Sequence, residues 1–460
     1  MHITETPSQR PGPLPMRRVP LREGLWRARG AIAFAVGLLM AGVVAMQLDR
    51  QMLRDGRAAL LDAGAVVNRS SSPRPLTAEE LAMARTAWAY FATHTRPETG
   101  WPDSVGGFPS TTMWDLSSYL LALPAAHRLG LIDRGSFLAR AGKALRSLAD
   151  IPLFEGRLPN KSYDTITLGM TDYDGNPTAE GIGWSALDIA RLLIALATLE
   201  RTAPELAPLT ARIRRRFDLR ALTEEGYLVG AIHDPASGAT YHLQEGRTGY
   251  EEYAARGAAL AGLDVMAALR VEDHGVLQRL YGIPVLTDDR RGKAGDAQST
   301  TLSEPYLLTA FELGLDTVAR AAADRLYRVQ KARFERTGIL TSLSEDHLDR
   351  APFFLYGTVI GNGIPWAVLD EDGNDYPALR TFSAKAALGW SLLYEDADPE
   401  HARRLRAALA PLATDQGWYA GIYERTGEPN RALTANTNGV ILEALHYRAF
   451  GPLLLAGTGQ

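Results

Sequence analysis

The chain has 460 residues, of which 46% are apolar, and its formal charge is −4. This length and composition allow a large hydrophobic core, and the absence of a basic stripe argues against nucleic-acid binding. No cysteine is present, so disulfides, Cys-ligated zinc and thiol catalysis are excluded.

A basic leader and an apolar segment precede the main body of the chain. Residues 1–30 contain six arginines and two acidic residues, and residues 31–48 are almost entirely apolar. About 20 such residues span a bilayer, and the preceding arginines predict a cytoplasmic N-terminus. We therefore expect an inner-membrane anchor with the rest of the chain in the periplasm, and a cleaved signal peptide is the alternative. Residues 49–74 are charged or Ser-rich and are predicted to form a linker.

Residues 75–460 are predicted to fold as one all-α domain. A capping box at Thr77-Ala78-Glu79-Glu80 begins a helix that ends near His94. Apolar residues at helical spacing predict eleven further helices, at about 114–129, 136–149, 182–200, 205–218, 249–269, 273–281, 303–314, 316–334, 381–395, 399–411 and 435–450. Short β segments are expected at 227–232 and 353–358, but strands and helices do not alternate as in a Rossmann or TIM-barrel fold.

Every second predicted helix begins with an aromatic or polar motif that follows a polar loop. The six motifs are Thr112-Met113-Trp114-Asp115, Gly181-Ile182-Gly183-Trp184, Gly249-Tyr250-Glu251-Glu252-Tyr253, Ser303-Glu304-Pro305-Tyr306, Thr381-Phe382-Ser383-Ala384-Lys385 and Thr434-Ala435-Asn436-Thr437-Asn438. Plain and motif-bearing helices in alternation predict a double ring of helices, the (α/α)6 toroid. In such a ring the motif-bearing helix ends converge on one mouth, where we expect the chemistry.

The strongest candidate for catalysis is the pair Glu251 and Glu252, which lies between two tyrosines at a predicted helix start. Aromatic neighbours can desolvate one carboxyl and raise its pKa for general-acid catalysis on a glycosidic bond. Alternatively, the pair only complements the helix dipole. If Glu251 is the general acid, the base that activates water would be Asp115, Glu424 or Asp172.

Further residues are expected to bind the sugar, because flat aromatic rings pack on pyranose rings and polar groups bond to hydroxyls. The predicted binding residues are Trp114, Asp174, Trp184, Tyr250, Tyr253, Glu304, Trp366, Lys385, Trp418, Tyr419, Asn436 and Asn438. The nine histidines have no metal-ligand spacing, and the segment 172–176 matches a calcium loop only in part. Neither a metal nor a cofactor is expected.

Taken together, these motifs resemble a bacterial family of domains of unknown function with a glucoamylase-like toroid. The resemblance spans about residues 80–450 and is carried by the segments 111–115, 172–175, 183–185, 250–255, 303–306, 383–387 and 436–438. It implies an (α/α)6 barrel exported to the periplasm, often beside envelope polysaccharide machinery. The sequence is also distantly similar to bacterial β-1,2-glucanases, which share the toroid and use an acidic pair.

In this comparison Glu251 takes the position of the general acid. Asn436-Thr437-Asn438 stands where the glucanases have an Asp near the start of the last inner helix. Since asparagine cannot act as a base, another carboxylate would take over, water would be activated indirectly, or the protein would only bind glycan.

We therefore predict a periplasmic glycoside hydrolase that cleaves a glucan, with a β-1,2 linkage among the candidates, by carboxylate catalysis with inversion. One alternative is a non-catalytic glycan-binding scaffold of a polysaccharide system. Another is a polysaccharide lyase or epimerase on the same fold, with Tyr250 or Tyr253 as the base.

Overall fold

The computed structural model describes residues 70–290 and 297–455. It also describes, as helical, Ala33, Phe34, Val36, Gly37, Leu38, Met40, Gly42 and Val44. The chain divides into two units, Met1–Ala59 and Leu60–Gln460. The predicted leader, most of the predicted anchor and nearly all of the predicted linker lie outside the described residues. Among the residues that are described, no helix is long and apolar enough to cross a membrane.

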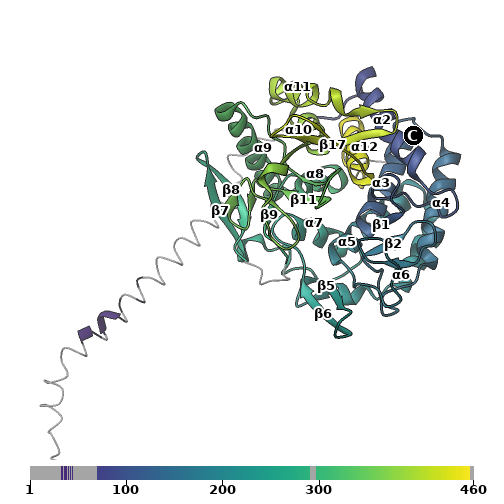
Figure 1. Ribbon diagram of the computed structural model, residues 1–460, viewed down its shortest axis with the longest axis horizontal. Coiled ribbons are helices and arrows are strands. Elements are labelled where there is room, and N and C mark those ends of the chain that lie inside the picture. Colours follow the sequence, from purple (N-terminus) through teal and green to yellow (C-terminus); the bar gives the residue numbers. More distant parts are fainter. Residues whose placement is uncertain are drawn as a thin grey trace, which may run out of the picture. The chain divides into compact units, whose positions relative to one another are not determined.

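The inner helices pack around a common axis and form a ring (Figure 1). They are α3 (Met113–Arg128), α5 (Ala186–Thr202), α7 (Tyr250–Leu260), α8 (Glu304–Leu308) with the π-helical turn Thr309–Leu313, α10 (Ala384–Tyr394) and α12 (Ala435–Phe450). Each contacts the next, and α12 contacts α3, which closes the ring. Every residue of α10 is buried, as a position between two layers requires. The prediction of a helical α/α toroid is confirmed.

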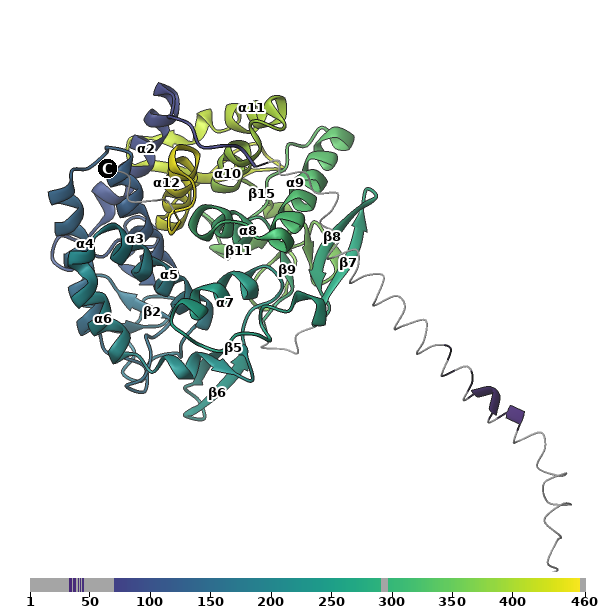
Figure 2. The ribbon, with the colours of Figure 1, turned by 180° about the vertical axis from the view of Figure 1, so that it is seen from behind.

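An outer ring surrounds the inner one (Figure 2). Its helices are α2 (Ala78–His94), α4 (Arg134–Asp150), α6 (Ala207–Arg216), α9 (Thr317–Thr337) and α11 (Pro399–Ala407). Between α7 and α8, the described chain forms the hairpin of β7 (Gly275–Leu280) and β8 (Ile283–Asp288), which packs beside α9.

The helix predicted at 273–281 is therefore wrong. Tyr281 and Gly282 both have positive φ angles, of 51° and 81°, and they form a two-residue turn between the paired residues Leu280 and Ile283. Two positive φ angles match the twist of an antiparallel hairpin and are incompatible with a helix.

The connecting loops carry short antiparallel sheets, which face the viewer in Figure 1. The sheets are β1 (Ser110–Thr112), β2 (Ser162–Asp164) and β3 (Met170–Thr171); β4 (Thr223–Glu224), β5 (Tyr227–Asp234) and β6 (Ala239–Gln244); β9 (Thr300–Thr301), β12 (Ile360–Gly361) and β13 (Ile364–Pro365); β10 (Glu345–His347), β11 (Phe354–Gly357) and β14 (Val368–Leu369); and β15 (Thr381–Ser383), β16 (Ala413–Thr414), β17 (Gly417–Tyr423) and β18 (Pro429–Leu433). The predicted segments at 227–232 and 353–358 correspond to β5 and β11 and are confirmed.

Candidate active site

The N-terminal ends of the inner helices meet around the buried carboxylate of Glu304. Its Oε1 accepts hydrogen bonds from Asn436 Nδ2 at 2.7 Å and from Trp114 Nε1 at 3.4 Å. Its Oε2 accepts one from Ser344 Oγ at 3.2 Å and pairs with the Lys385 ammonium. Four of the predicted motif residues are thus brought together. Because both oxygens are engaged, Glu304 is suited to orient the side chains around it.

Asp115 and Asp188 occupy equivalent positions on neighbouring inner helices. Each is the third residue of its helix, and its backbone N–H donates at 3.1 Å to the hydroxyl of the N-cap residue, Thr112 or Ser185. This is the usual capping geometry, and it points both side chains towards the helix start. Asp115 Oδ2 also accepts hydrogen bonds from Ser104 Oγ at 2.6 Å and from Thr112 Oγ1 at 3.0 Å.

Asp188 keeps one oxygen free. Its Oδ1 accepts a hydrogen bond from Ser185 Oγ at 3.0 Å, whereas its Oδ2 has no hydrogen-bond partner among the described residues. Burial, followed by the charge of Glu245, raises the pKa of Asp188 to about 7, while the Ser185 hydroxyl acts in the opposite direction. The charge of Asp115 adds to the increase, so the carboxyls of α3 and α5 lie close enough to interact.

A short strand brings two further titratable groups to the mouth. In the antiparallel pair of β10 and β11, Glu345 lies opposite Tyr356. Side chains alternate between the two faces of a strand, so Glu345 and His347 share one face. Asp346 points to the other, where two hydroxyls of β15 donate to it at 3.1 Å each.

Glu345 has the properties of a general acid. Burial, followed by the charge of Glu304, raises the pKa of Glu345 to about 8, while Lys385 and the Tyr250 hydroxyl act in the opposite direction. The charge of Asp188 adds to the increase. A carboxyl with such a pKa holds its proton at neutral pH.

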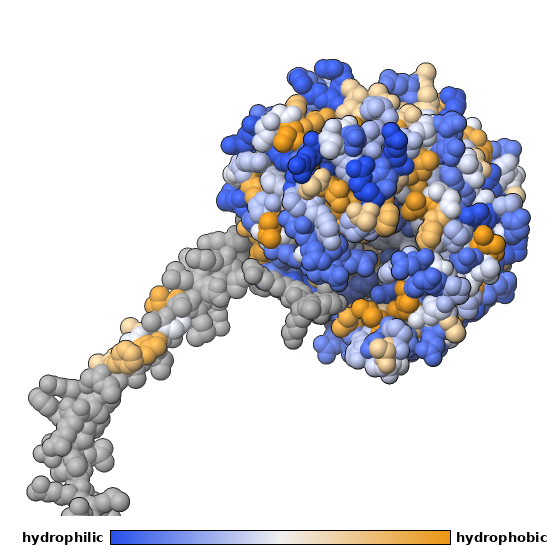
Figure 3. Space-filling model, viewed as in Figure 1, coloured by the Kyte–Doolittle hydropathy of each residue, from blue (hydrophilic) through white to orange (hydrophobic). Residues whose placement is uncertain are grey.

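Two loops that are far apart in the sequence meet over these groups. Burial, followed by the charges of Glu345 and Glu371, raises the pKa of Tyr356 well above its usual value, and Tyr173 contributes as well. Tyr173 comes from the 172–176 turn and Glu371 from the 370–375 turn. Figure 3 shows this face of the molecule hollowed above the region of β5 and β6.

We use the name mouth cluster for Asp115, Asp188, Glu304, Glu345 and Lys385. The predicted residues Asp172 and Asp174 do not join it. Asp172 closes its own turn, since it accepts hydrogen bonds from Asn176 N at 2.8 Å and Nδ2 at 3.0 Å, and Asp174 is exposed.

The predicted acid pair Glu251 and Glu252 is held by hydrogen bonds and an ion pair. Glu251 is completely buried; its Oε1 accepts a hydrogen bond from Gln244 Nε2 at 2.8 Å and its Oε2 pairs with Arg290 at 2.6 Å. Burial raises the pKa of Glu251, and Arg290 partly opposes this. Glu252 accepts a hydrogen bond from Gly249 N at 2.5 Å. Among the described residues, the hydrogen-bond and ion-pair partners of both acids lie outside the mouth cluster, and their catalytic role stays a prediction.

Glu424, another predicted base, is held in a salt bridge. Its two oxygens accept hydrogen bonds from Arg333 at 2.6 and 2.7 Å, and Arg380 adds a third at 3.1 Å. Although burial raises the pKa of Glu424, these two guanidinium groups lower it overall. A carboxylate bound in this way is suited to structural pairing rather than to water activation.

Several predicted sugar-binding residues have structural contacts instead. The indole N–H of Trp184 donates to Val229 O, and that of Trp418 to Met83 O, both at 3.1 Å. Asn438 Oδ1 accepts a hydrogen bond from Trp418 N at 2.8 Å. Packing positions of this kind are occupied by Trp184, Tyr253, Trp366, Trp418, Tyr419 and Asn438.

The mouth also contains residues that the sequence analysis did not select. They are Tyr173, Asp188, Glu345, His347, Tyr356 and Glu371. One signal was available, because Ser185 and Asp188 repeat the spacing of Thr112 and Asp115. A second was the segment 344–347, which places two acids and a histidine together in a long loop.

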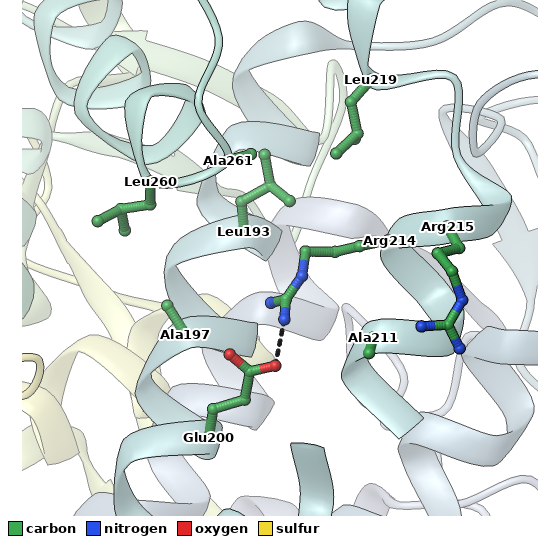
Figure 4. Close-up of a pocket in the computed structure, with 9 residues that line it drawn as sticks. All are labelled: Leu193, Ala197, Glu200, Ala211, Arg214, Arg215, Leu219, Leu260 and Ala261. Atoms are coloured by element: carbon green, nitrogen blue, oxygen red, sulfur yellow. Dashed lines mark hydrogen bonds and ion pairs between the residues drawn. The ribbon is translucent and has the colours of Figure 1, made fainter. Parts of the chain in front are cut away.

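A cavity of about 440 Å³ lies between α5, α6 and the end of α7 (Figure 4). It is lined by Leu193, Ala197, Glu200, Ala211, Arg214, Arg215, Leu219, Leu260 and Ala261. Arg214 and Glu200 form an ion pair across it. Since it contains no residue of the mouth cluster, we assign it no part in catalysis.

The closed inner ring and its outer helices define an α/α toroid of the glucoamylase-like fold. The chain belongs to the family described as a protein of unknown function (DUF3131), which matches residues 82–451. Comparison with curated proteins gives no match.

Solved structures of several differently named proteins share the fold of this chain. A candidate glucoamylase from Bacteroides caccae is 15% identical over 82% of this chain and 94% of that chain, with a TM-score of 0.59. The endo-β-1,2-glucanase from Chitinophaga pinensis, in complex with sophorotriose and glucose, is 13% identical over 83% and 94%, with a TM-score of 0.56. Cellobiose 2-epimerase from Bacillus thermoamylovorans is 12% identical over 81% and 100%, with a TM-score of 0.51. At such identities the likeness concerns the fold.

Proposed function

We propose that this protein is a glycoside hydrolase that cleaves a glucan, with Glu345 as the proton donor and Asp188 as the base. The observation that carries the proposal is the buried Glu345 carboxyl, which lies opposite Tyr356; the neighbouring charges of Glu304 and Asp188 help to raise its pKa to about 8. The fold shared with an endo-β-1,2-glucanase supports a glucan as the substrate, and β-1,2-glucan is the first candidate.

In this mechanism Glu345 gives its proton to the glycosidic oxygen while the bond from that oxygen to the anomeric carbon breaks. Asp188 takes a proton from the water that attacks the anomeric carbon from the opposite side, so the configuration inverts. Proton exchange with solvent then restores both carboxyls. Asp115, the base proposed from the sequence, is less suitable because its Oδ2 already accepts two hydroxyl hydrogen bonds.

A glucan panel tests the proposal. The full chain is expected to release reducing ends from one member of a set of β-1,2-, β-1,3-, β-1,4- and α-linked glucans, and proton NMR of the first product should show the inverted anomer. A reducing-end assay measures the release. A folded protein that cleaves none of the glucans contradicts the proposal and favours a binding scaffold, and an unsaturated product that absorbs in the ultraviolet indicates a lyase.

The pH dependence gives a second expected result. Asp188 must lose its proton, which it does as the pH rises through about 7. Glu345 must keep its proton, which it loses as the pH rises through about 8. The value of kcat/KM should therefore peak at about pH 7.5 and fall on both sides, because it follows the titration of the free enzyme. Initial rates between pH 5 and pH 10 check this, and a profile that stays level above about pH 9 contradicts the role of Glu345.

A lyase or epimerase with a tyrosine base has less support. Burial raises the pKa of both Tyr250 and Tyr253 well above the usual value. The Tyr253 hydroxyl also donates to Glu312 Oε2 at 2.6 Å. Neither group is therefore suited to remove a proton from a sugar near neutral pH.

We further propose that the domain acts in the periplasm and is held at the inner membrane through residues 31–48. This rests on the arginines before the apolar run. A partnership with polysaccharide-synthesis machinery belongs to the same proposal. Fractionation of cells that express the full chain tests the location, because recovery in the soluble cytoplasm would contradict it.

A further inference from the structure

A second buried charge cluster lies within the inner ring. The Arg191 guanidinium on α5 is 3.3 Å from Glu312 Oε1 and 3.2 Å from Glu443 Oε1. All three side chains are completely buried. They come from α5, from the π-helical turn after α8 and from α12, and we refer to them as the axial cluster. Glu312 owes its place to that turn, and π-helical turns occur frequently at functional sites.

The axial cluster contains one cation and two carboxyl groups. Burial, followed by the charge of Glu312, raises the pKa of Glu443 well above its usual value. Burial raises the pKa of Glu312 as well, and Arg191 opposes this increase. Arg191 and the Tyr253 hydroxyl both donate to Glu312, and Arg191 also donates to Glu443. These hydrogen bonds fix the plane of the Arg191 guanidinium.

The same guanidinium contacts the floor of the mouth. Arg191 Nη1 donates to Ser118 Oγ at 2.8 Å and to Trp114 O at 3.4 Å. Its central carbon lies 4.7 Å from the centre of the Trp114 ring. A planar, delocalised cation against an indole is attracted by the ring electrons and limits how the ring can turn.

Trp114 connects the axial cluster to the mouth cluster. Its ring is also bounded by Tyr250 and Tyr253, whose ring centres lie 5.7 and 5.9 Å away. From this position the indole N–H donates to Glu304 Oε1, the oxygen that also binds Asn436. Glu304 in turn pairs with Lys385. An unbroken chain of contacts therefore leads from the axial cluster to the charges that surround Glu345.

We propose that Arg191 is a positioning residue, which acts through Trp114 to hold Glu304 and its partners in the arrangement that binds and cleaves the glycan. The inference rests on the proposed function for its catalytic consequence. The orientation of Trp114 itself does not depend on that function and can be measured separately.

The test is Arg191→Lys in the full chain, which keeps the charge and removes the planar guanidinium. The near-ultraviolet circular dichroism of Trp114 is obtained first, as the difference between wild type and Trp114→Phe. We expect Arg191→Lys to abolish most of this difference signal while the far-ultraviolet spectrum is kept. On β-1,2-glucan, kcat/KM should fall about tenfold or more, mainly through kcat, because the group acts on the reacting arrangement rather than on the distant parts of the substrate.

Arg140→Lys is the matched control, because the Arg140 guanidinium lies 5.4 Å from the centre of the Trp88 ring in the outer ring. It should leave both readouts unchanged. If Arg191→Lys does not fold, Ser118→Ala serves instead, because it removes one hydrogen bond to Arg191 without changing a charge. Ser118→Ala should weaken the Trp114 circular dichroism signal and lower kcat/KM about fivefold.

An unchanged Trp114 signal in both Arg191→Lys and Ser118→Ala would overturn the inference, as would kcat/KM values within twofold of wild type. If wild type cleaves no glucan of the panel, the proposed hydrolysis fails, while loss of the Trp114 signal in Arg191→Lys still supports the positioning role.

Discussion

Replacement of Glu345 by glutamine is expected to lower kcat for glucan cleavage by about 10²–10⁴-fold, the usual contribution of a positioned proton donor. Glutamine has nearly the same shape as a protonated glutamate, and it retains the place opposite Tyr356 in the pair of β10 and β11. It cannot give a proton to the leaving oxygen. Steady-state kinetics measure the loss, and thermal unfolding confirms that the variant is folded.

Glu251→Gln is the informative comparison, because it makes the same chemical change at the acid that the sequence singled out. Its carboxylate bonds to Gln244 and Arg290 rather than to the mouth cluster. We expect this variant to keep kcat within about tenfold of wild type, since it removes no proton donor from the mouth. An inactive Glu251→Gln beside an active Glu345→Gln would reverse the assignment.

Replacement of Arg191 by methionine is expected to have the largest effect on stability. Removal of the cation leaves the carboxyl groups of Glu312 and Glu443 buried without an opposite charge, and such a change typically costs about 3–5 kcal/mol. Methionine is unbranched and flexible, so it fills much of the space that the side chain leaves. Urea unfolding followed by circular dichroism measures the change in the free energy of unfolding.

Glu443→Gln is its control. Glutamine keeps the size of the side chain and an oxygen that can accept from Arg191, and the Arg191–Glu312 pair stays intact. The free energy of unfolding should therefore change by no more than about 1 kcal/mol. A large loss in this variant, or none in Arg191→Met, would contradict the central place of Arg191 in the axial cluster.

The ring of helices could be predicted because the sequence signals for each helix lie within a short stretch of neighbouring residues. The capping box at Thr77 is present, with Thr77 N donating to Glu80 Oε2 at 2.8 Å and Glu80 N donating to Thr77 Oγ1 at 3.2 Å. The alternation of plain and motif-bearing helices also follows the chain. The hairpin at 275–288 was missed because its apolar residues also fit a helical spacing, and its turn residue Tyr281 is an unusual choice for a positive φ angle.

The site was predicted only in part, for a physical reason. Trp114, Asp115, Glu304, Lys385 and Asn436 were found because helix starts mark them. Glu345 lies on a short strand within a long loop, and its function depends on burial and on the charge of Glu304. Neither property is visible in a run of neighbouring residues. Conversely, Glu251 has the expected motif, but Arg290 binds it from a distant segment.

The closure of the inner ring by α12 on α3 has a consequence for how the chain folds. Glu443 lies on α12, 252 positions after Arg191 in the sequence. The last inner helix therefore both closes the ring and completes the axial cluster. Contacts of such long range make folding slow. A chain synthesised only as far as α11 would leave the apolar inner face of α3 open to water. Shortened chains that lack α12 should therefore aggregate rather than fold into a smaller ring.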